Sequence, residues 1–446
     1  MNSTPTPPSD PMAAEMRRVH QLIGAGRLQE AATALNAAQR TAPRDARIFM
    51  LGIILASRAG NPDGAVAAGR RALALAPRWH AAMIELGLAL ARKGGKDELA
   101  EALALAKSAV ALAPQDAGAL DRAIAIAESA KAAQEALAWA EAGARLRPDD
   151  IRYQLVLGRQ HERQKDFARA REHYRAAAAI DPDNPLALQG LLRCSLGLED
   201  TQAAQAQAQA LIERFPGDAM VRYLHALAHG QTPPTQPAPV ITSLFDQYAE
   251  RFDLHLVRGL KYKVPERVAQ KLLELHPDKK FNLLDLGCGT GLLGVYLGPI
   301  DGFIIGVDLS RKMIEQAARH RIYARFHAVN LLDALRDTPA DHYEAITCLD
   351  ALIYVGDLTP VIPNALRILK PGGHFIFSCE AAQEGEPDLA LRRPSSRYAH
   401  RDTAVERQCR QAGFADIQIE QLPALRMEND APLPGFLVTA RKPFAA

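Results

Sequence analysis

Cysteines and long apolar runs are scarce in this chain, and each scarcity excludes a class of protein. The 446 residues hold five cysteines, which are far apart and odd in number, so neither a disulfide framework nor a zinc site is predicted. No uninterrupted apolar stretch reaches the roughly 20 residues that a membrane span needs. We therefore expect a cytoplasmic protein with reduced thiols, no metal and no membrane span.

Excess charge of one sign is also missing. The formal net charge is +2 and the sequence pI is about 8.2, so no overall field favours nucleic acid or an anionic membrane. Residues 1–11 are rich in Pro, Ser and Thr and lack an apolar core. They are predicted to be a disordered leader and not a signal peptide.

The first half of the chain repeats itself. Between residues 12 and 230, alanine-rich helical stretches each end at a proline, and these prolines are Pro43, Pro77, Pro114, Pro148, Pro182 and Pro216. Their separations are 34, 37, 34, 34 and 34 residues. A proline ends one helix and presets the turn into the next, so a fixed proline period predicts an array of helical hairpins.

A 34-residue helical period resembles the tetratricopeptide repeat. The fifth unit shows the resemblance best, with the pair Leu157-Gly158, then Phe167, and packing positions at Ala170, Tyr174 and Ala177. We expect about six repeats over residues 12–230. The three extra residues of the third unit are expected in its internal turn, near Lys93 to Glu98. Ala219 to His229 are expected to form a capping helix, because the last repeat has no neighbour to cover its apolar face.

Arrays of this kind form a concave groove that commonly binds a protein partner. The positions expected to line it are Arg58, Arg92, Arg159, Arg163 and Arg193, beside Ile54 and Leu88. These arginines would suit an acidic or mixed peptide. The alternative is that they form an ordinary solvated face.

Residues 231–240 are proline-rich and uncharged, which is typical of a semi-rigid linker.

Residues 241–446 then form the predicted second domain. The apolar strand before Asp285 is followed by glycines at 287, 289 and 291 and by an apolar helix from Leu292. A strand, a glycine turn and a helix make a nucleotide site in open α/β sheets. A dinucleotide fingerprint would need glycine at 292, so a different cofactor is indicated.

Strands and helices continue to alternate toward the C-terminus. Strands are predicted at 281–286, 303–308, 325–329, 345–349 and 374–378, with later ones at 417–419 and 433–439. Alternation of this kind predicts a mainly parallel sheet. Asp308 ends the second strand, 23 residues after Asp285, close to the roughly 20 expected for an acid that binds ribose hydroxyls.

The glycine motif, Asp308 and the turn Leu369-Lys-Pro-Gly-Gly373 together resemble the class I methyltransferases that use S-adenosylmethionine (SAM). The predicted fold is thus an all-α tetratricopeptide solenoid followed by a Rossmann-like methyltransferase domain. The resemblance implies SAM as methyl donor. It places these residues at the cofactor: Tyr248, Phe252, Asp285, Gly287, Cys288, Gly289, Gly291, Asp308, Leu309, Asn330, Leu331, Leu349 and Asp350. By the same resemblance Tyr262 belongs to a lid. The aromatic residues at 245, 248 and 252 are equally consistent with a helix core stripe.

Methyl transfer requires a nucleophile in line with the sulfonium and, for some acceptors, a base. The candidate bases are His255 and His400, and the candidate substrate contacts are Tyr354, Tyr398 and Asp350. Asp350 can alternatively cap the following helix. The Asn/Asp-Pro-Pro-Tyr signature of adenine methylases is absent, which disfavours nucleic-acid bases as acceptors.

Three functions remain open from the sequence. In the first, the repeats bind a protein partner or substrate for the methyltransferase. In the second, the enzyme methylates the oxygen or nitrogen of a small metabolite, and the repeats serve docking or oligomerisation. In the third, the chain is a scaffold that binds SAM without turnover.

Overall fold

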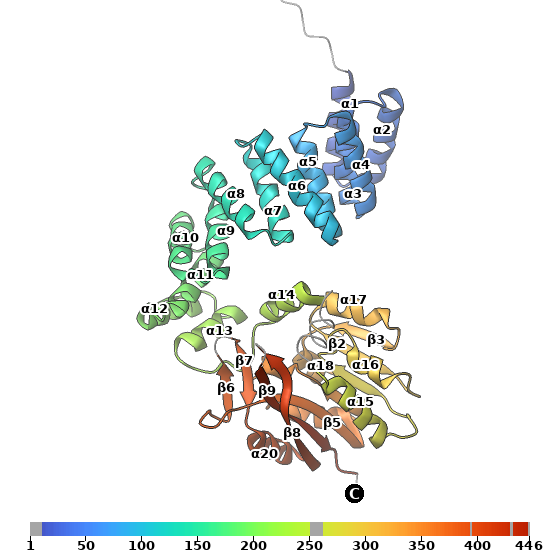
Figure 1. The fold of residues 1–446 in the computed structure, drawn as a ribbon, viewed down its shortest axis with the longest axis vertical. Helices are drawn as coiled ribbons and strands as arrows, with labels where there is room; N and C mark the ends of the chain where they lie inside the picture. The colour runs from blue at the N-terminus through green and yellow to red at the C-terminus, as the bar shows by residue number, and fades with distance from the viewer. Residues whose placement is uncertain (1–10, 250–261, 393–394, 429–430, 445–446) are drawn as a thin grey trace, which may run out of the picture. The chain divides into compact units, whose positions relative to one another are not determined.

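The chain divides into two units, which Figure 1 shows in blue to green and in green to red. One unit is Met1–Leu211 and the other is Ile212–Ala446. The computed structural model describes residues 11–249, 262–392, 395–428 and 431–444. The first unit is helical, and the second contains a sheet.

Antiparallel helices build the first unit, each stacked on the next. They are α1 (Pro11–Gly24), α2 (Leu28–Thr41), α3 (Ala46–Arg58), α4 (Pro62–Leu75), α5 (His80–Lys93), α6 (Lys96–Leu112), α7 (Ala117–Ser129), α8 (Ala133–Leu146), α9 (Ile151–Arg163), α10 (Phe167–Ile180), α11 (Pro185–Gly197) and α12 (Thr201–Arg214). The predicted helical array is confirmed. The three extra residues of the third repeat fall in the stretch predicted for them, near Lys93 to Glu98. They lengthen the start of α6, which has 17 residues against 14 in α4, and not the turn.

Small buried residues set how closely these helices approach. One alanine in the second helix of each hairpin is almost wholly buried, and the spacing of these alanines matches that of the prolines. They are Ala31, Ala65, Ala102, Ala136, Ala170 and Ala204. Gly158 serves the same purpose in α9, since a Cβ there would lie 2.8 Å from the Tyr174 ring. Helix packing therefore explains the alanine-rich composition.

The arginines expected in the groove differ in their surroundings. Arg193 is ion-paired with Glu162 at 2.5 Å and stacks over the Tyr174 ring. Arg159 lies 3.5 Å from Glu128. Arg58, Arg92 and Arg163 are exposed, and they match the solvated-face alternative as well as a binding role.

The second unit alternates helices with strands. Its helices are α13 (Ala219–Ala228), α14 (Ala238–Tyr248), α15 (Val264–Leu275), α16 (Leu292–Leu297), α17 (Arg311–Arg319), α18 (Leu331–Asp337), the 3-10 helix η3 (Leu352–Tyr354), α19 (Ile362–Ile368) and α20 (Asp402–Ala412). Its strands are β1 (Leu283–Leu286), β2 (Ile304–Asp308), β3 (Arg325–Ala328), β4 (Tyr343–Cys348), β5 (Leu369–Ala381), β6 (Leu389–Arg392), β7 (Arg397–His400), β8 (Ala415–Glu428) and β9 (Ala431–Arg441).

The sheet order is β3-β2-β1-β4-β5-β7-β6, and β9 pairs with both β5 and β8. Pairing is parallel from β3 to β5, whereas β9 runs antiparallel to β5. Because β1 lies between β2 and β4, the strand order reverses there, and ligands of open α/β sheets bind beyond the strand ends at such a point. The hairpin of β6 and β7 was not predicted, since its strands are short and rich in arginine.

Apolar side chains cover both faces of the sheet. On one face α18, α19 and α20 contribute Leu335, Ile362 and Cys409 to a core with Phe375 and Phe377. On the other face α15 and α16 pack against Leu283 and Ile376. The sheet is therefore a rigid platform for the residues at its strand ends.

The proline-rich stretch before α14 is held to the second unit by hydrogen bonds. We call residues 233–236 the connector. The carbonyl oxygen of Pro234 accepts from the backbone N–H groups of Gly356 and Asp357, both at 2.9 Å. Thr235 pairs with Val355 as an antiparallel bridge. The expectation of a spacer was thus incomplete, because composition does not reveal these long-range partners.

Candidate functional site

The glycine turn after β1 adopts a backbone that glycine suits best. Gly287 has a φ of 70° and Gly291 a φ of 81°. A Cβ at position 287 would lie 2.5 Å from the Cβ of Ala351, so close packing and backbone angle both require glycine there. The N–H groups of Gly287 and Cys288 donate to the Val307 carbonyl at 2.8 and 3.0 Å. These bonds fix the turn against the end of β2.

Asp285, at the end of β1, is 3 % exposed. Its carboxylate accepts hydrogen bonds from the Tyr323 hydroxyl at 2.7 Å and the Thr347 hydroxyl at 2.8 Å. Burial raises the pKa of Asp285 to about 6, although both hydroxyls act in the opposite direction. Tyr323 was missed by the sequence analysis, because no local pattern relates it to a strand 38 residues away.

Asp308 ties the glycine turn to the end of β2. Its carboxylate accepts from the N–H of Gly289 at 2.9 Å and from the N–H of Ser310 at 2.8 Å. Burial raises its pKa, and these backbone bonds oppose that shift. Ser310 in turn donates its hydroxyl to Asp246 of α14 at 2.5 Å. Helix α14 is therefore attached to the same corner of the site.

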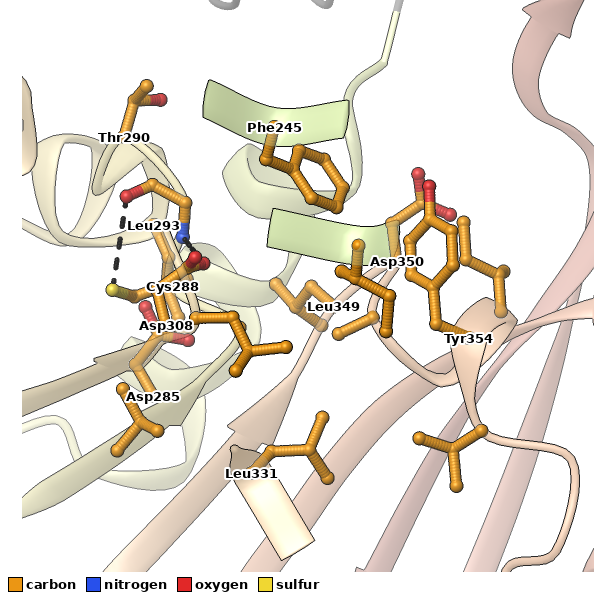
Figure 2. Close-up of a pocket in the computed structure, with 18 of the residues that line it drawn as sticks. Phe245, Asp285, Cys288, Thr290, Leu293, Asp308, Leu331, Leu349, Asp350 and Tyr354 are labelled. Carbon is orange, nitrogen blue, oxygen red and sulfur yellow. Dashed lines mark hydrogen bonds between the residues drawn. The ribbon is translucent and has the colours of Figure 1, made fainter. Parts of the chain in front are cut away.

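Most of the predicted cofactor residues line one cavity of about 360 Å³. They are Asp285, Gly287, Cys288, Gly289, Asp308, Leu309, Asn330, Leu331, Leu349 and Asp350, and Tyr354 joins them. In Figure 2, Asp285, Cys288 and Asp308 lie on one side and Asp350 and Tyr354 on the other. The cavity thus has a glycine-turn end and a second end, with Phe245 of α14 above the space between them.

Some predicted residues lie elsewhere. Gly291 does not line the cavity but precedes the first residue of α16. Tyr398 is fully buried and donates its hydroxyl to the Pro233 carbonyl at 2.8 Å. His400 Nε2 lies 3.0 Å from the Gly356 carbonyl. Neither Tyr398 nor His400 is among the residues that line the cavity, and both hold the connector region.

Two predicted residues, Phe252 and His255, lie outside the described part of the structure. Tyr248 is the last residue of α14, and its side chain lies outside the described part as well. Asn330 does line the cavity, and its side-chain oxygen accepts from the Leu332 N–H at 2.9 Å, capping α18.

The second end of the cavity carries charges that the sequence analysis did not assign. Arg426 of β8 is 2 % exposed and ion-paired with both Asp350 and Glu380. Arg397 of β7 lies 3.2 Å from Glu428. No local pattern marks these charges, because β8 carries several other polar residues and the partners of Arg426 are 46 and 76 residues away. The cavity wall also includes Thr235 of the connector.

The described residues support neither a metal site nor a membrane-spanning helix. They contain no group of three or more His, Cys, Asp or Glu side chains placed to hold a metal ion. None of their helices is long and apolar enough to cross a bilayer.

The chain matches known families in both halves. A model described as "Methyltransferase domain" matches residues 260–419. Two tetratricopeptide repeat models match residues 16–78, 52–117 and 127–185, and residues 163–228.

Ubiquinone biosynthesis O-methyltransferase of Proteus mirabilis is 27% identical over 142 residues, which cover 31% of this chain and 56% of that protein. The Coxiella burnetii enzyme of the same name is 31% identical over 129 residues, covering 28% and 51%. The chain spans about half the length of these relatives.

Two solved structures each match about half of this chain. The 1,6-didemethyltoxoflavin-N1-methyltransferase of Burkholderia thailandensis is 18% identical, with a TM-score of 0.37 over 48% of this chain and 93% of that one. The type IV pilus biogenesis factor PilW is 15% identical, with a TM-score of 0.41 over 48% and 99%. From the family matches, the chain carries tetratricopeptide repeats within residues 16–228, followed by a class I methyltransferase domain at residues 260–419.

Proposed function

We propose that this chain binds SAM at the glycine-turn end of the cavity and transfers its methyl group to an acceptor at the second end. SAM supplies a methyl carbon activated by a sulfonium, together with an ammonium group. The observation that carries the proposal is a pair of acids that line one cavity, the buried Asp285 and the partly buried Asp308. Among the described residues neither carboxylate has a basic side chain as partner. Buried charges need a partner, so the site suits a cationic ligand.

The individual roles follow from position. We assign Asp308 to accept hydrogen bonds from the two ribose hydroxyls, since a carboxylate can accept both bonds at once. Asp285 is to face the ammonium of the methionine moiety. Gly287 and Gly289 let the ligand approach bare backbone. Asn330 and Leu331, which line the cavity where α18 begins, are to contact the adenine ring.

Binding of the donor is tested by calorimetry on the full chain with SAM and its product S-adenosylhomocysteine. Asp308→Asn should weaken both ligands about tenfold or more, because the neutral amide is a poorer acceptor for two hydroxyls. Asp301→Asn, on an exposed acid outside the cavity, is the matched control. Unchanged affinity in Asp308→Asn would refute the assigned site.

Two acceptor classes follow from the two halves of the chain. In the first, the repeats bind a protein partner or protein substrate, as such repeats commonly do. In the second, the acceptor is a small molecule and the repeats serve docking or oligomerisation. The second is favoured by the relatives, which are named as ubiquinone biosynthesis O-methyltransferases.

Tritiated methyl-SAM separates these classes. The full chain is incubated with a desalted extract of the source cells and, separately, with their low-mass fraction. Label in a discrete protein band, lost in Asp285→Ala, supports a protein acceptor. Label confined to the low-mass fraction supports a metabolite. If SAM binds and no label transfers to either fraction, the chain is a SAM-binding scaffold and the proposed turnover is wrong.

A further inference from the structure

The second end of the cavity is polar, although apolar side chains such as Ile353 and Val355 surround it. Asp350 follows β4 at the sheet's carboxyl edge and lies beside Tyr354 in Figure 2. Arg426 reaches the same end from β8, and Tyr262 lines it ahead of α15. These three side chains come from distant segments, so the folded sheet is what brings them together.

Asp350 is held in an unfavourable backbone conformation. Its φ is 52°, in the left-handed region that residues other than glycine rarely adopt. Its N–H donates to the Ser378 hydroxyl at 2.9 Å, and its carboxylate is ion-paired with Arg426. Such local strain persists where the surroundings fix a residue for function. The strained backbone and these two contacts together hold the Asp350 carboxylate in one position at the cavity wall.

The ion pair behind Asp350 is more deeply buried than Asp350 itself. The side chains of Arg426 and Glu380 are each 2 % exposed, whereas the Asp350 side chain is 20 % exposed. A buried ion pair contributes little net stability, because desolvation offsets most of the attraction. Its observable effect here is geometric, since Arg426 fixes the carboxylate of Asp350 from the protein side.

Tyr262 presents a free hydroxyl at the same end. The residue is 5 % exposed, and its Oη has no hydrogen-bond partner among the described residues. Burial and the nearby Asp350 raise its pKa well above the ordinary value, while Arg426 and the Ser378 hydroxyl act in the opposite direction. Tyr262 is therefore a neutral hydroxyl. A buried hydroxyl without a hydrogen-bond partner lowers the stability of the folded protein. A bound ligand that forms this hydrogen bond removes the cost.

We propose that Asp350 and Tyr262 form the acceptor subsite, and that the acceptor is an amine or a hydroxyl compound. This inference rests on the proposed methyl transfer. The N–H or O–H of the acceptor donates to Asp350. The Tyr262 hydroxyl lies beside the same heteroatom, where it accepts a second N–H of an amine or donates to the second lone pair of a hydroxyl oxygen, so that one lone pair stays free to attack the methyl carbon. As that heteroatom forms its bond to the methyl carbon, the carbon–sulfur bond breaks and the electron pair stays on sulfur as a neutral thioether. The proton of the acceptor passes to Asp350 and then to solvent.

The same geometry argues against a carboxylate acceptor. Asp350 would repel it, and the arginines on the cavity wall are already engaged. Arg426 is paired with Asp350 and Glu380, and Arg397 lies 3.2 Å from Glu428 and 3.8 Å from Glu380. No arginine that lines the described cavity is left without a carboxylate partner.

The test uses two probes that need no knowledge of the acceptor. Sinefungin carries an amine where SAM carries its methyl group, so the amine occupies the position of the reacting centres. S-adenosylhomocysteine lacks any group there. Calorimetry on the full chain gives the dissociation constant of each, and the informative quantity is their ratio. Asp350→Asn should weaken sinefungin about tenfold or more relative to S-adenosylhomocysteine, since a charge-assisted hydrogen bond is lost.

Tyr262→Phe is the second variant, and it removes only the unpartnered hydroxyl. It should shift the ratio in the same direction by about threefold to tenfold. Because this variant keeps the tyrosine ring and removes one hydroxyl alone, it is expected to fold even if Asp350→Asn does not. Asp333→Asn, on an exposed acid of α18, is the control and should leave the ratio unchanged.

Each outcome is decisive. A ratio shifted in both variants supports the subsite. A ratio unchanged in Tyr262→Phe and in folded Asp350→Asn overturns it, as does equal weakening of both ligands, which would place Asp350 at the cofactor instead. In those cases the proposed SAM site stands. If the unmodified chain binds neither probe, the proposed function itself fails.

Discussion

At the scale of single residues, Asp285 combines full burial with two hydroxyl partners and no cation among the described residues. Its pKa of about 6 in the free protein means that the carboxyl is partly protonated at mildly acidic pH. A cationic ligand stabilises the charged form. Binding below that pH therefore has to be coupled to loss of a proton.

SAM affinity should accordingly be constant from pH 8 to about 7 and fall below about pH 6, approaching tenfold per pH unit. The sign follows from the raised pKa, because acid protonates the group that the ligand needs charged. Calorimetry from pH 5 to 8 measures the slope. Asp285→Asn should bind weakly and lose most of this pH dependence, and a flat profile in the unmodified chain would count against the role of Asp285.

At the scale of elements, the connector depends on side chains of the hairpin β6–β7. Tyr398 donates to Pro233, and Gln236, which is 5 % exposed, donates its side-chain amide to the Ser396 carbonyl. Gly356 leaves room for this contact, since a Cβ there would lie 2.6 Å from the Tyr398 ring. Connector, hairpin and η3 therefore form one cooperative element beside the second end of the cavity.

Tyr398→Phe should destabilise this element by about 1 kcal/mol, the usual net value of one buried hydrogen bond. Hydrogen exchange of the full chain is the measurement. The amides of Gly356 and Asp357, which donate to Pro234, should exchange faster in the variant. Tyr296→Phe, on an exposed tyrosine of α16, should leave them unchanged. Equal protection in Tyr398→Phe would show that the tyrosine does not hold the connector.

At the scale of the whole second unit, two histidines are half-buried away from the cavity. His374 of β5 packs edge-on against His276, with ring centroids 6.1 Å apart. Burial, followed by the nearby His276 and Arg441, lowers the pKa of His374 to about 4. The pKa of His276 is lowered by burial as well. Both are therefore neutral in the folded chain at pH 7.

Because the folded pKa of His374 lies below the unfolded value of about 6.5, the unfolded chain binds protons first as pH falls. The stability of this unit should thus be insensitive to His374 above about pH 6.5 and decrease between about pH 6.5 and 4. His374→Gln should flatten that decrease in urea unfolding at pH 7 and pH 5. His320→Gln, on an exposed histidine, should not. A slope that His374→Gln leaves intact would assign the acid sensitivity to other groups.

Local patterns predicted much of this molecule, and long-range pairing explains what they left out. The proline period predicted the array, and the glycine turn with Asp308 predicted the ends of β1 and β2. Tyr323, Glu380 and Arg426 were missed because each acquires its role from a partner far along the chain. The three extra residues of the third repeat were predicted in the right stretch but in a turn, since the sequence pattern does not show whether the turn or the start of helix α6 is lengthened.

The connector also bears on how this catalytic module can be recombined. Thr235 lines the cavity, yet it precedes residue 260, where the match to the methyltransferase family begins. A gene fusion that replaced the repeats and joined a new arm at residue 240 would discard part of the cavity wall. A transferable module has to start upstream of Pro233. The segment that looks most dispensable by composition is thus one that an engineered chimera, or an evolutionary domain exchange, has to carry along.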